Sequence, residues 1–223
     1  LKCEIKRIGI DYSFKVEDSR LAWNPDPSRW GAARTYSDLQ IPGSGDDAVL
    51  HNTAGAIAIV ESMDADLPVR KNAVREGLAN TELSGRIQVL PGGIEQIFDV
   101  AHNPAAIANL AAFIDKRHPV RRNLAVFSML KDKDLAEVVR LMGSRIASWH
   151  LTQLDGSRAI PLQDLADVVS NHSNSDIKMW PNPLHAYKMA MQLAHPGDRV
   201  VVFGSFYLVG AILKSVSGHP LQA

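Results

Sequence analysis

Apolar residues in the second half of the chain follow two alternating spacings. From about residue 88, short apolar runs rich in β-branched residues are followed by longer segments in which apolar residues recur every three or four positions. The first pattern is typical of buried strands and the second of amphipathic helices. The predicted strands are 87–90, 96–101, 124–130, 148–154, 176–180 and 199–205, and the predicted helices are 104–114, 132–146, 161–169, 183–194 and 206–216.

This order of elements predicts an α/β fold. Strands separated by helices indicate βαβ units, whose crossovers give a Rossmann-like, mostly parallel sheet with helices on both faces. The turn Pro91-Gly92-Gly93 predicts that the first two strands form a hairpin. Asn103 is a favoured N-cap and Pro104 is a favoured first helical residue, so a helix is predicted to begin there.

The first 87 residues have a different pattern. Short strands are predicted at 3–10, 11–16 and 20–25, residues 28–47 read mostly as connection, and helices are predicted at 51–62 and 69–81. These strands are too few to close a core, so the segment is expected to be the end of a larger unit. The boundary is predicted near Ser84-Gly85-Arg86.

Composition and charge exclude several classes of protein. The chain of 223 residues has 24 basic and 24 acidic residues, and no dense cluster of Lys and Arg predicts nucleic-acid binding. The apolar runs are broken by Gly and polar residues and fall short of the roughly 20 residues of a membrane span. The single Cys3 excludes an internal disulfide framework. Cytoplasm is therefore the expected location.

Three polar residues crowd the turn in FDVAHNP, residues 98–104. Asp99, His102 and Asn103 are predicted at the carboxyl end of a strand, where open α/β sheets bind ligands. A carboxylate there suits ribose hydroxyl groups, and an imidazole and an amide suit a base, a phosphate or a metal-bound water. Alternatively, Asn103 caps its helix, Asp99 bonds backbone N–H groups and His102 is solvated. The remaining histidines show no spacing of metal ligands, so no metal site is predicted.

Four sequence blocks carry a family resemblance. LSGRIQ, FDVAHNP, MLKDKD and VVVFGSFYLVG occur in this order along the chain. Together they resemble the carboxyl-terminal portion of the bifunctional dihydrofolate synthase/folylpolyglutamate synthases of the Mur ligase superfamily. The resemblance spans Asn52 to Gly210. It implies ATP-dependent ligation of L-glutamate to dihydropteroate or a folate, through an acyl phosphate that the glutamate amine attacks.

The resemblance also implies roles for particular residues. Asp99 would reach the ribose of ATP, with His102 and Asn103 beside it, and Arg86 would lie against the phosphates. Arg86 and Asp99 are expected to face one crevice. Asn52 would contact the adenine, although a helix N-cap formed with Thr53 is the structural alternative.

The glutamate pocket is expected in the last domain. Lys133 would pair with a substrate carboxylate and, with His102, is assigned a catalytic role; Arg158, Ser205 and Phe206 would bind the substrate. The plain alternatives are a solvated lysine between two aspartates and a simple N-cap at Ser205. The chain departs from the family at Ser128, Ser157 and Tyr207, where Gly, Pro and His are common, and this places the glutamate pocket in doubt.

A phosphate-binding loop of the form G-x-x-x-x-G-K-[ST] is absent, because the chain contains no Gly-Lys dipeptide. Residues 1–86 are therefore expected to be the tail of a central P-loop ATPase domain, and 87–223 the glutamate ligase domain. The P-loop and the Mg²⁺ ligands would come from an upstream part, and this chain alone is expected to be inactive.

Three further expectations stay open at this point. The missing domain, or a second copy of the chain, would cover the apolar faces of the first segment. A nucleotide- or amino-acid-binding module without catalysis is one alternative function. Another Mur-type amino-acid ligase is a second.

Overall fold

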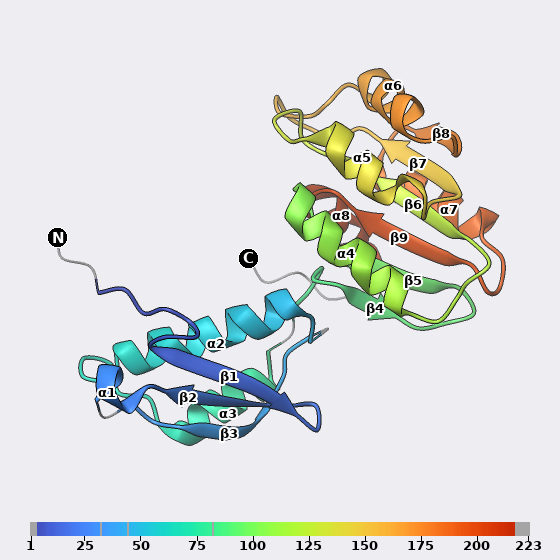
Figure 1. The fold of residues 1–223 in the computed structure, drawn as a ribbon. Helices are drawn as coiled ribbons and strands as arrows, with labels where there is room; N and C mark the ends of the chain where they lie inside the picture. Colours follow the sequence, from blue (N-terminus) through green and yellow to red (C-terminus); the bar gives the residue numbers. More distant parts are fainter. Residues whose placement is uncertain (1–3, 32, 44, 82, 217–223) are drawn as a thin grey trace. The chain divides into compact units, whose positions relative to one another are not determined.

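The computed structural model describes residues 4–31, 33–43, 45–81 and 83–216. The chain divides into two compact units, residues 1–83 and 84–223. In each unit, helices lie against a sheet (Figure 1). One apolar cluster lies in the first unit and two lie in the second.

The first unit is a small antiparallel sheet covered by helices. Its strands pair in the order β1-β2-β3. Its elements are β1 Tyr12–Glu17, β2 Arg20–Pro25, α1 Pro27–Trp30, β3 Tyr36–Gln40, α2 Asp47–Ser62 and α3 Lys71–Ala79.

This unit corrects three sequence-based predictions. No strand forms in residues 4–10, where only an isolated bridge joins Ile8 to Tyr12; Cys3 lies outside the described residues. The segment 28–47, predicted to be connection, contains β3 and most of α1. A core does close, because the fully buried side chains of Trp23 and Tyr36 pack with apolar residues of α2. The two large aromatic side chains bury the apolar area that the few strands of this unit were not expected to provide.

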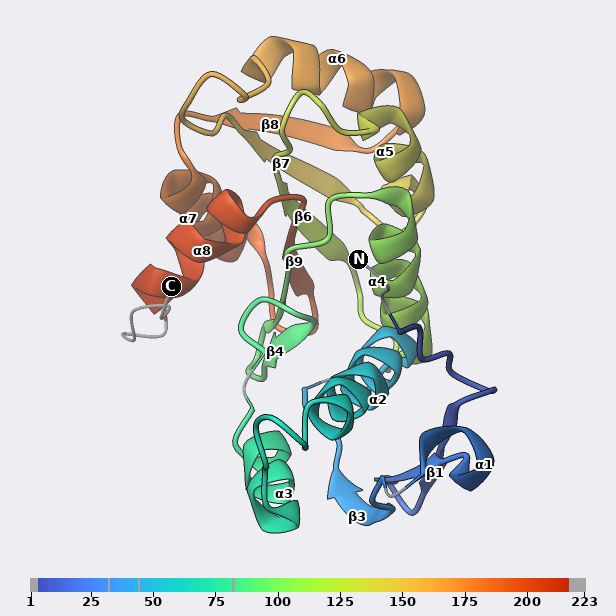
Figure 2. The same ribbon diagram turned by 90° about the vertical axis from the view of Figure 1, so that its left-hand side faces the viewer.

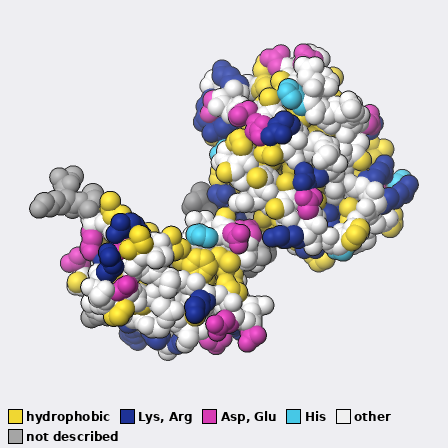
Figure 3. All heavy atoms as spheres, viewed as in Figure 1, with side chains coloured by type: hydrophobic (Ala, Val, Ile, Leu, Met, Phe, Trp, Pro, Cys, Tyr) yellow, Lys and Arg dark blue, Asp and Glu magenta, His cyan; other side chains and the backbone are white. Residues whose placement is uncertain are grey.

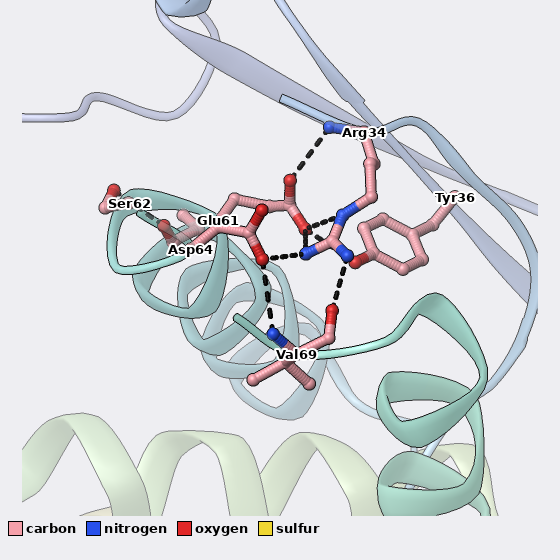
Figure 4. Close-up of polar contacts among 7 residues, drawn as sticks. Arg34, Tyr36, Glu61, Ser62, Asp64 and Val69 are labelled. Atoms are coloured by element: carbon pink, nitrogen blue, oxygen red, sulfur yellow. Dashed lines mark hydrogen bonds and ion pairs between the residues drawn. The ribbon is translucent and has the colours of Figure 1, made fainter. Parts of the chain in front are cut away.

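A polar cluster joins the elements of the first unit (Figure 4). The Arg34 side chain donates from Nε to Glu61 Oε1 at 3.0 Å and pairs with Asp64 Oδ1 at 2.8 Å. It also donates to the Val69 carbonyl, and the Tyr36 hydroxyl donates to Glu61 Oε1 at 2.6 Å. Burial and the Glu61 carboxylate raise the pKa of Tyr36 well above its usual value. One guanidinium thus connects the segment before β3 to the end of α2 and the loop after it.

The second unit is the predicted α/β domain. Its sheet has the order β4-β5-β9-β6-β7-β8, in which β4 and β5 form the predicted hairpin and every other pair is parallel. Its elements are β4 Gln88–Leu90, β5 Glu95–Asp99, α4 Pro104–Lys116, β6 Asn123–Phe127, α5 Leu135–Gly143, β7 Ser148–Thr152, α6 Leu162–His172, β8 Asp176–Trp180, α7 Pro183–Leu193, β9 Arg199–Phe203 and α8 Phe206–Val216.

Helices cover both faces of this sheet, as predicted. Figure 2 shows α4, α5 and α6 on one face and α7 and α8 on the other, and two separate apolar clusters fill the two interfaces. Several boundaries differ from the prediction by two or three residues. The strand expected to reach residue 130 ends at Phe127, and the helix expected to end at Val169 continues to His172. Strand β6 ends early because residues 128–134 turn across the carboxyl edge of the sheet before the Asp134 N-cap of α5.

Charged residues of both signs are mixed over the visible faces of both units (Figure 3). This agrees with the equal numbers of basic and acidic residues. Among the helices of the described segments, none is both long and apolar enough to cross a membrane.

A buried histidine lies in the sheet of the second unit. His150 on β7 is completely buried, and its Nδ1 accepts a hydrogen bond from Trp180 Nε1 at 3.1 Å. The ring therefore carries its proton on Nε2, which has no hydrogen-bond partner among the described residues. Burial, with a smaller contribution from the charge of Lys178, lowers the pKa of His150 from 6.5 to about 4.

This histidine predicts acid sensitivity. Between pH 6.5 and pH 4 the unfolded chain binds a proton at this position and the folded chain does not, so stability is complete above pH 6.5 and falls as the pH is lowered. A pKa difference of this size corresponds to roughly 3 kcal/mol. Urea unfolding at pH 7.5, 6.5, 5.5 and 4.5 measures the loss. The variant His150→Asn, which keeps an acceptor for Trp180, should lose this part of the pH dependence. If the free energy of unfolding of the variant falls with pH above pH 5 as steeply as that of the native chain, the assignment to His150 is wrong.

Candidate functional site

A cavity of about 360 Å³ opens at the carboxyl edge of the parallel strands in the second unit. It is lined by His102, Leu130, Lys133, Arg158, Gly204, Ser205, Phe206 and Tyr207. These residues lie in the connections that follow β5, β6, β7 and β9 and in the first turn of α8. Carboxyl ends of parallel strands meet at one edge, so residues far apart in sequence converge there. The cavity brings together five of the predicted site residues.

The two cations of the cavity share one carboxylate. Arg158 forms a bidentate ion pair with Asp132, with Nη2 at 2.9 Å and 2.8 Å from its two oxygens. Lys133 Nζ lies 3.6 Å from Oδ2 of the same residue. The hydrogen bond from Arg158 lowers the pKa of Asp132, so this carboxylate is ionised at neutral pH. Two cations with a single carboxylate leave one positive charge beside the cavity for an anionic substrate group.

The connections that carry these cations are joined through their backbones. Leu130 and Ala159 form an isolated antiparallel bridge, and the Lys131 N–H donates to the Arg158 carbonyl at 3.0 Å. Lys133 and Arg158 are therefore held near each other although 25 residues separate them.

An aromatic and cationic group forms the other side of the site. The ring of His102 lies 5.6 Å from that of Phe206, and the Arg86 guanidinium lies 5.4 Å over the Phe206 ring. His102 Nδ1 is 2.9 Å from the Val100 carbonyl, which only accepts, so Nδ1 carries the proton. Nε2 of the neutral ring is then the acceptor available to a ligand.

The residues between β9 and α8 are tightly placed. Gly204 has φ of 110°, and Ser205 is buried. Ser205 Oγ accepts a hydrogen bond from the Tyr207 N–H at 3.1 Å, so it satisfies a backbone donor at the start of α8. Phe206 and Tyr207, by contrast, are more than half exposed at the cavity.

Asp99 is placed differently from the cations. Its carboxylate is buried, at 6% exposure, and accepts hydrogen bonds from the N–H groups of Ile87 at 2.9 Å and Ala101 at 2.6 Å. It thus holds the backbone next to Arg86. Neither Asp99 nor Arg86 lines the cavity, so the expected common crevice is not seen there. The contact of Asp99 with a ribose stays a prediction, and it requires this carboxylate to become accessible.

The two asparagines differ in position. Asn103 is the N-cap of α4, as predicted, and its side chain accepts from the Ala106 N–H at 2.9 Å. Asn52 is exposed in the second turn of α2, in the first unit. The alternative that Asn52 caps this helix is wrong, because α2 begins one turn earlier and Asp46 is its N-cap. A nucleotide contact of either residue stays a prediction.

The described residues contain no group of three or more His, Cys, Asp or Glu side chains placed to hold a metal ion. Three lining residues, Leu130, Gly204 and Tyr207, were not among the predicted site residues. Gly204 had a sequence signal, because a glycine between a buried strand and a Ser at a helix start often marks a tight turn. Asp132 was noted only as a neighbour of Lys133, since nothing in the sequence pairs it with Arg158.

Comparison with known proteins gives one family match. The family model described as "Mur ligase, glutamate ligase domain" matches residues 85–206. Dihydrofolate synthase/folylpolyglutamate synthase of Escherichia coli K12 is 29% identical over 96% of this chain and 47% of the relative. The protein of the same name from Haemophilus influenzae is 27% identical over 94% of this chain and 49% of the relative.

Solved structures agree with these matches. The structure of the E. coli protein in complex with DHPP and ADP has a TM-score of 0.76 at 29% identity, over 95% of this chain and 47% of that chain. A bifunctional folylpolyglutamate synthase/dihydrofolate synthase with Mn, AMPPNP and L-glutamate bound has a TM-score of 0.73 at 25% identity, over 96% and 48%. The chain thus spans about half the length of the relatives it matches. These findings confirm the resemblance that the four sequence blocks indicated.

Proposed function

Since the chain belongs to the Mur ligase family through its glutamate ligase domain, we propose that it is part of an ATP-dependent ligase that joins L-glutamate to dihydropteroate or to folates. Residues 84–216 bind the incoming glutamate in this reaction. The observation that carries the proposal is the carboxyl-edge cavity, where Lys133 and Arg158 converge. The relatives are dihydrofolate and folylpolyglutamate synthases, which favours this reaction over a binding module without catalysis and over other Mur-type ligations.

The chemistry proposed for the cavity is binding and orientation. The substrate carboxylate takes the γ-phosphoryl group of ATP; the glutamate amine then attacks the carbonyl carbon of this acyl phosphate, phosphate leaves and an amide forms. Lys133 and Arg158 bind carboxylates of glutamate, since a guanidinium fork and an ammonium group suit this charge. Catalysis comes mainly from positioning the amine and from stabilising negative charge as phosphate leaves. His102, with Nε2 available, is placed to accept a proton from the amine.

ATP and Mg²⁺ are the proposed cosubstrate and metal. Arg86, Asp99, Asn103 and Asn52 are the proposed nucleotide contacts. No described group of side chains suits a metal by itself, so Mg²⁺ would be held by phosphate oxygens and by a P-loop domain, which is the proposed partner of this chain. A single cysteine is consistent with the cytoplasm as the proposed location.

Glutamate binding tests this proposal directly. We expect L-glutamate to bind the chain and Arg158→Gln to weaken binding by 10-fold or more, because hydrogen bonds between charged groups contribute roughly 1.5–3 kcal/mol. Titration calorimetry measures the affinity, and amide NMR shifts locate the ligand. Lys133→Gln should act in the same direction.

The matched control is Arg140→Gln. Arg140 is an exposed arginine on α5 that pairs with Glu137 and does not line the cavity. Its replacement should leave glutamate affinity unchanged. Equal affinities for the native chain, Arg158→Gln and Lys133→Gln would remove the cavity as the glutamate site.

A further inference from the structure

A second cavity, of about 470 Å³, opens at the amino edge of the same sheet. Its walls come from the connection between α4 and β6 and from the connection between α5 and β7. Asn123 and Arg199, which also line it, are the first residues of β6 and β9. Since the glutamate pocket lies at the carboxyl edge, the two cavities are separate and neither proposal depends on the other.

Arginine dominates this second cavity. Five guanidinium groups and one imidazole line it, from Arg117, Arg121, Arg122, Arg145, Arg199 and His118. Asp115 is the only acidic residue in the lining. The chain as a whole has no net charge, so this excess of cations is local.

Part of this charge is neutralised by ion pairs. Arg145 pairs with Asp115 at 2.6 Å and Arg122 with Asp198 at 2.6 Å. Arg145 also donates to the Leu141 carbonyl at the end of α5, where helices favour cations. These two arginines are therefore explained by local structure.

Of the remaining three arginines, Arg199 and Arg117 share one carboxylate. Arg199 donates from Nε to Glu95 Oε1 at 2.5 Å, and Arg117 pairs with the other oxygen of Glu95. Arg121 forms no ion pair within 4 Å in the described segments, although its charge helps to lower the pKa of Asp198. Three guanidinium groups against one carboxylate leave two formal positive charges at the cavity.

Burial makes this excess costly. Arg199 is only 1% exposed, and its other nitrogens donate to neutral oxygens, Asn123 Oδ1 at 3.3 Å and the His118 carbonyl at 3.2 Å. A buried cation that shares its counter-ion is poorly compensated, and an anion in the adjacent cavity would lower its energy. Planar guanidinium forks favour the oxygen pairs of phosphate and carboxylate groups.

We propose that the amino-edge cavity is a binding site for a small oxyanion with two or more negative charges. Arg121 and the free nitrogens of Arg117 and Arg122 supply the donors. The buried Glu95–Arg199–Arg117 group keeps the cavity positive. The volume is sufficient for a pyrophosphate or a tricarboxylate.

Titration with inorganic pyrophosphate and, separately, with citrate tests the site. We expect amide NMR shifts in residues 117–123 and 144–147 of the labelled chain, and tighter binding of at least one of these anions than of acetate or orthophosphate. The tighter of the two assigns the oxyanion class. Arg121→Gln should weaken binding about fivefold, as loss of one exposed charge contact predicts. Binding should also weaken as salt is added.

Arg158→Gln distinguishes this site from the glutamate pocket, because it removes a cation at the opposite edge. It should leave pyrophosphate and citrate affinity unchanged. The proposal is overturned if the anions shift residues of the carboxyl edge but not residues 117–123, if Arg158→Gln weakens binding as much as Arg121→Gln does, or if no saturable binding is seen. Arg121 is exposed and its backbone bond to Gly197 is retained in the variant, so Arg121→Gln should remain folded.

Discussion

Gly204→Ala is expected to destabilise the second unit by about 2–5 kcal/mol and to close part of the glutamate pocket. Gly204 has φ of 110°, in a region that residues with a side chain rarely adopt, and this conformation costs roughly 1–2 kcal/mol. An added Cβ would also lie 2.6 Å from the Ser128 carbonyl oxygen and 2.7 Å from the Phe127 ring. The Ser128 oxygen belongs to the backbone of the adjacent connection, so it cannot move aside without moving the chain. Overpacking of this kind adds roughly 1–3 kcal/mol.

The control for this prediction is Gly197→Ala. Gly197 has φ of 88° and precedes the same strand, but a Cβ there meets nothing within 4 Å. Its replacement isolates the conformational cost, so it should destabilise by roughly 1–2 kcal/mol only. Amide hydrogen exchange of β6 and β9 in the whole chain measures both variants. If the two variants lose equal stability, the close approach of residue 204 to residue 128 contributes nothing to the loss.

A comparable loss is expected in the first unit for Arg34→Met. The Glu61 side chain is 1% exposed, and the variant leaves its charge buried with Tyr36 as the remaining side-chain donor. Asp64 and the Val69 carbonyl also lose their guanidinium partner. Removing one member of a buried ion pair costs about 3–5 kcal/mol. Hydrogen exchange of α2 amides reports this loss within the intact chain.

Two further variants separate charge from packing. Arg20→Met removes an exposed ion pair of the same unit, 3.6 Å from Asp38, and should cost less than about 1 kcal/mol. The double variant Arg34→Met with Glu61→Gln removes the uncompensated charge, so it should be more stable than Arg34→Met alone. A double variant that is less stable than the single one would show that the cost lies in hydrogen bonding or packing instead.

Local patterns predicted most of the second unit. Its strands are short apolar runs and its helices repeat apolar residues every three or four positions, and Asn103, Asp134 and Asn182 cap helices through bonds to backbone N–H groups three residues away. Such signals lie within a few residues, so they can be read before the fold is known. The candidate site followed from the same logic, because parallel strands place their following connections at one edge.

The first unit was predicted less well because its structure depends on contacts between residues far apart in the sequence. Strand β3 is short, carries Ser37 and Asp38 at its exposed positions, and is defined by pairing with β2. The core of the first unit depends on packing of Trp23, Trp30 and Tyr36, which come from three different segments. None of these contacts has a local pattern in the sequence.

The sequence by itself determined the α/β alternation, most helix starts of the second unit and the family, because each depends on residues close together or on motifs in a fixed order. The tertiary structure alone decided which charges meet. Arg34 with Glu61, Arg158 with Asp132, and Arg199 with Glu95 are separated by 27, 26 and 104 residues. Ion pairs at such separations depend on how the chain folds back on itself, and a linear pattern of charges does not specify which opposite charge each one will meet.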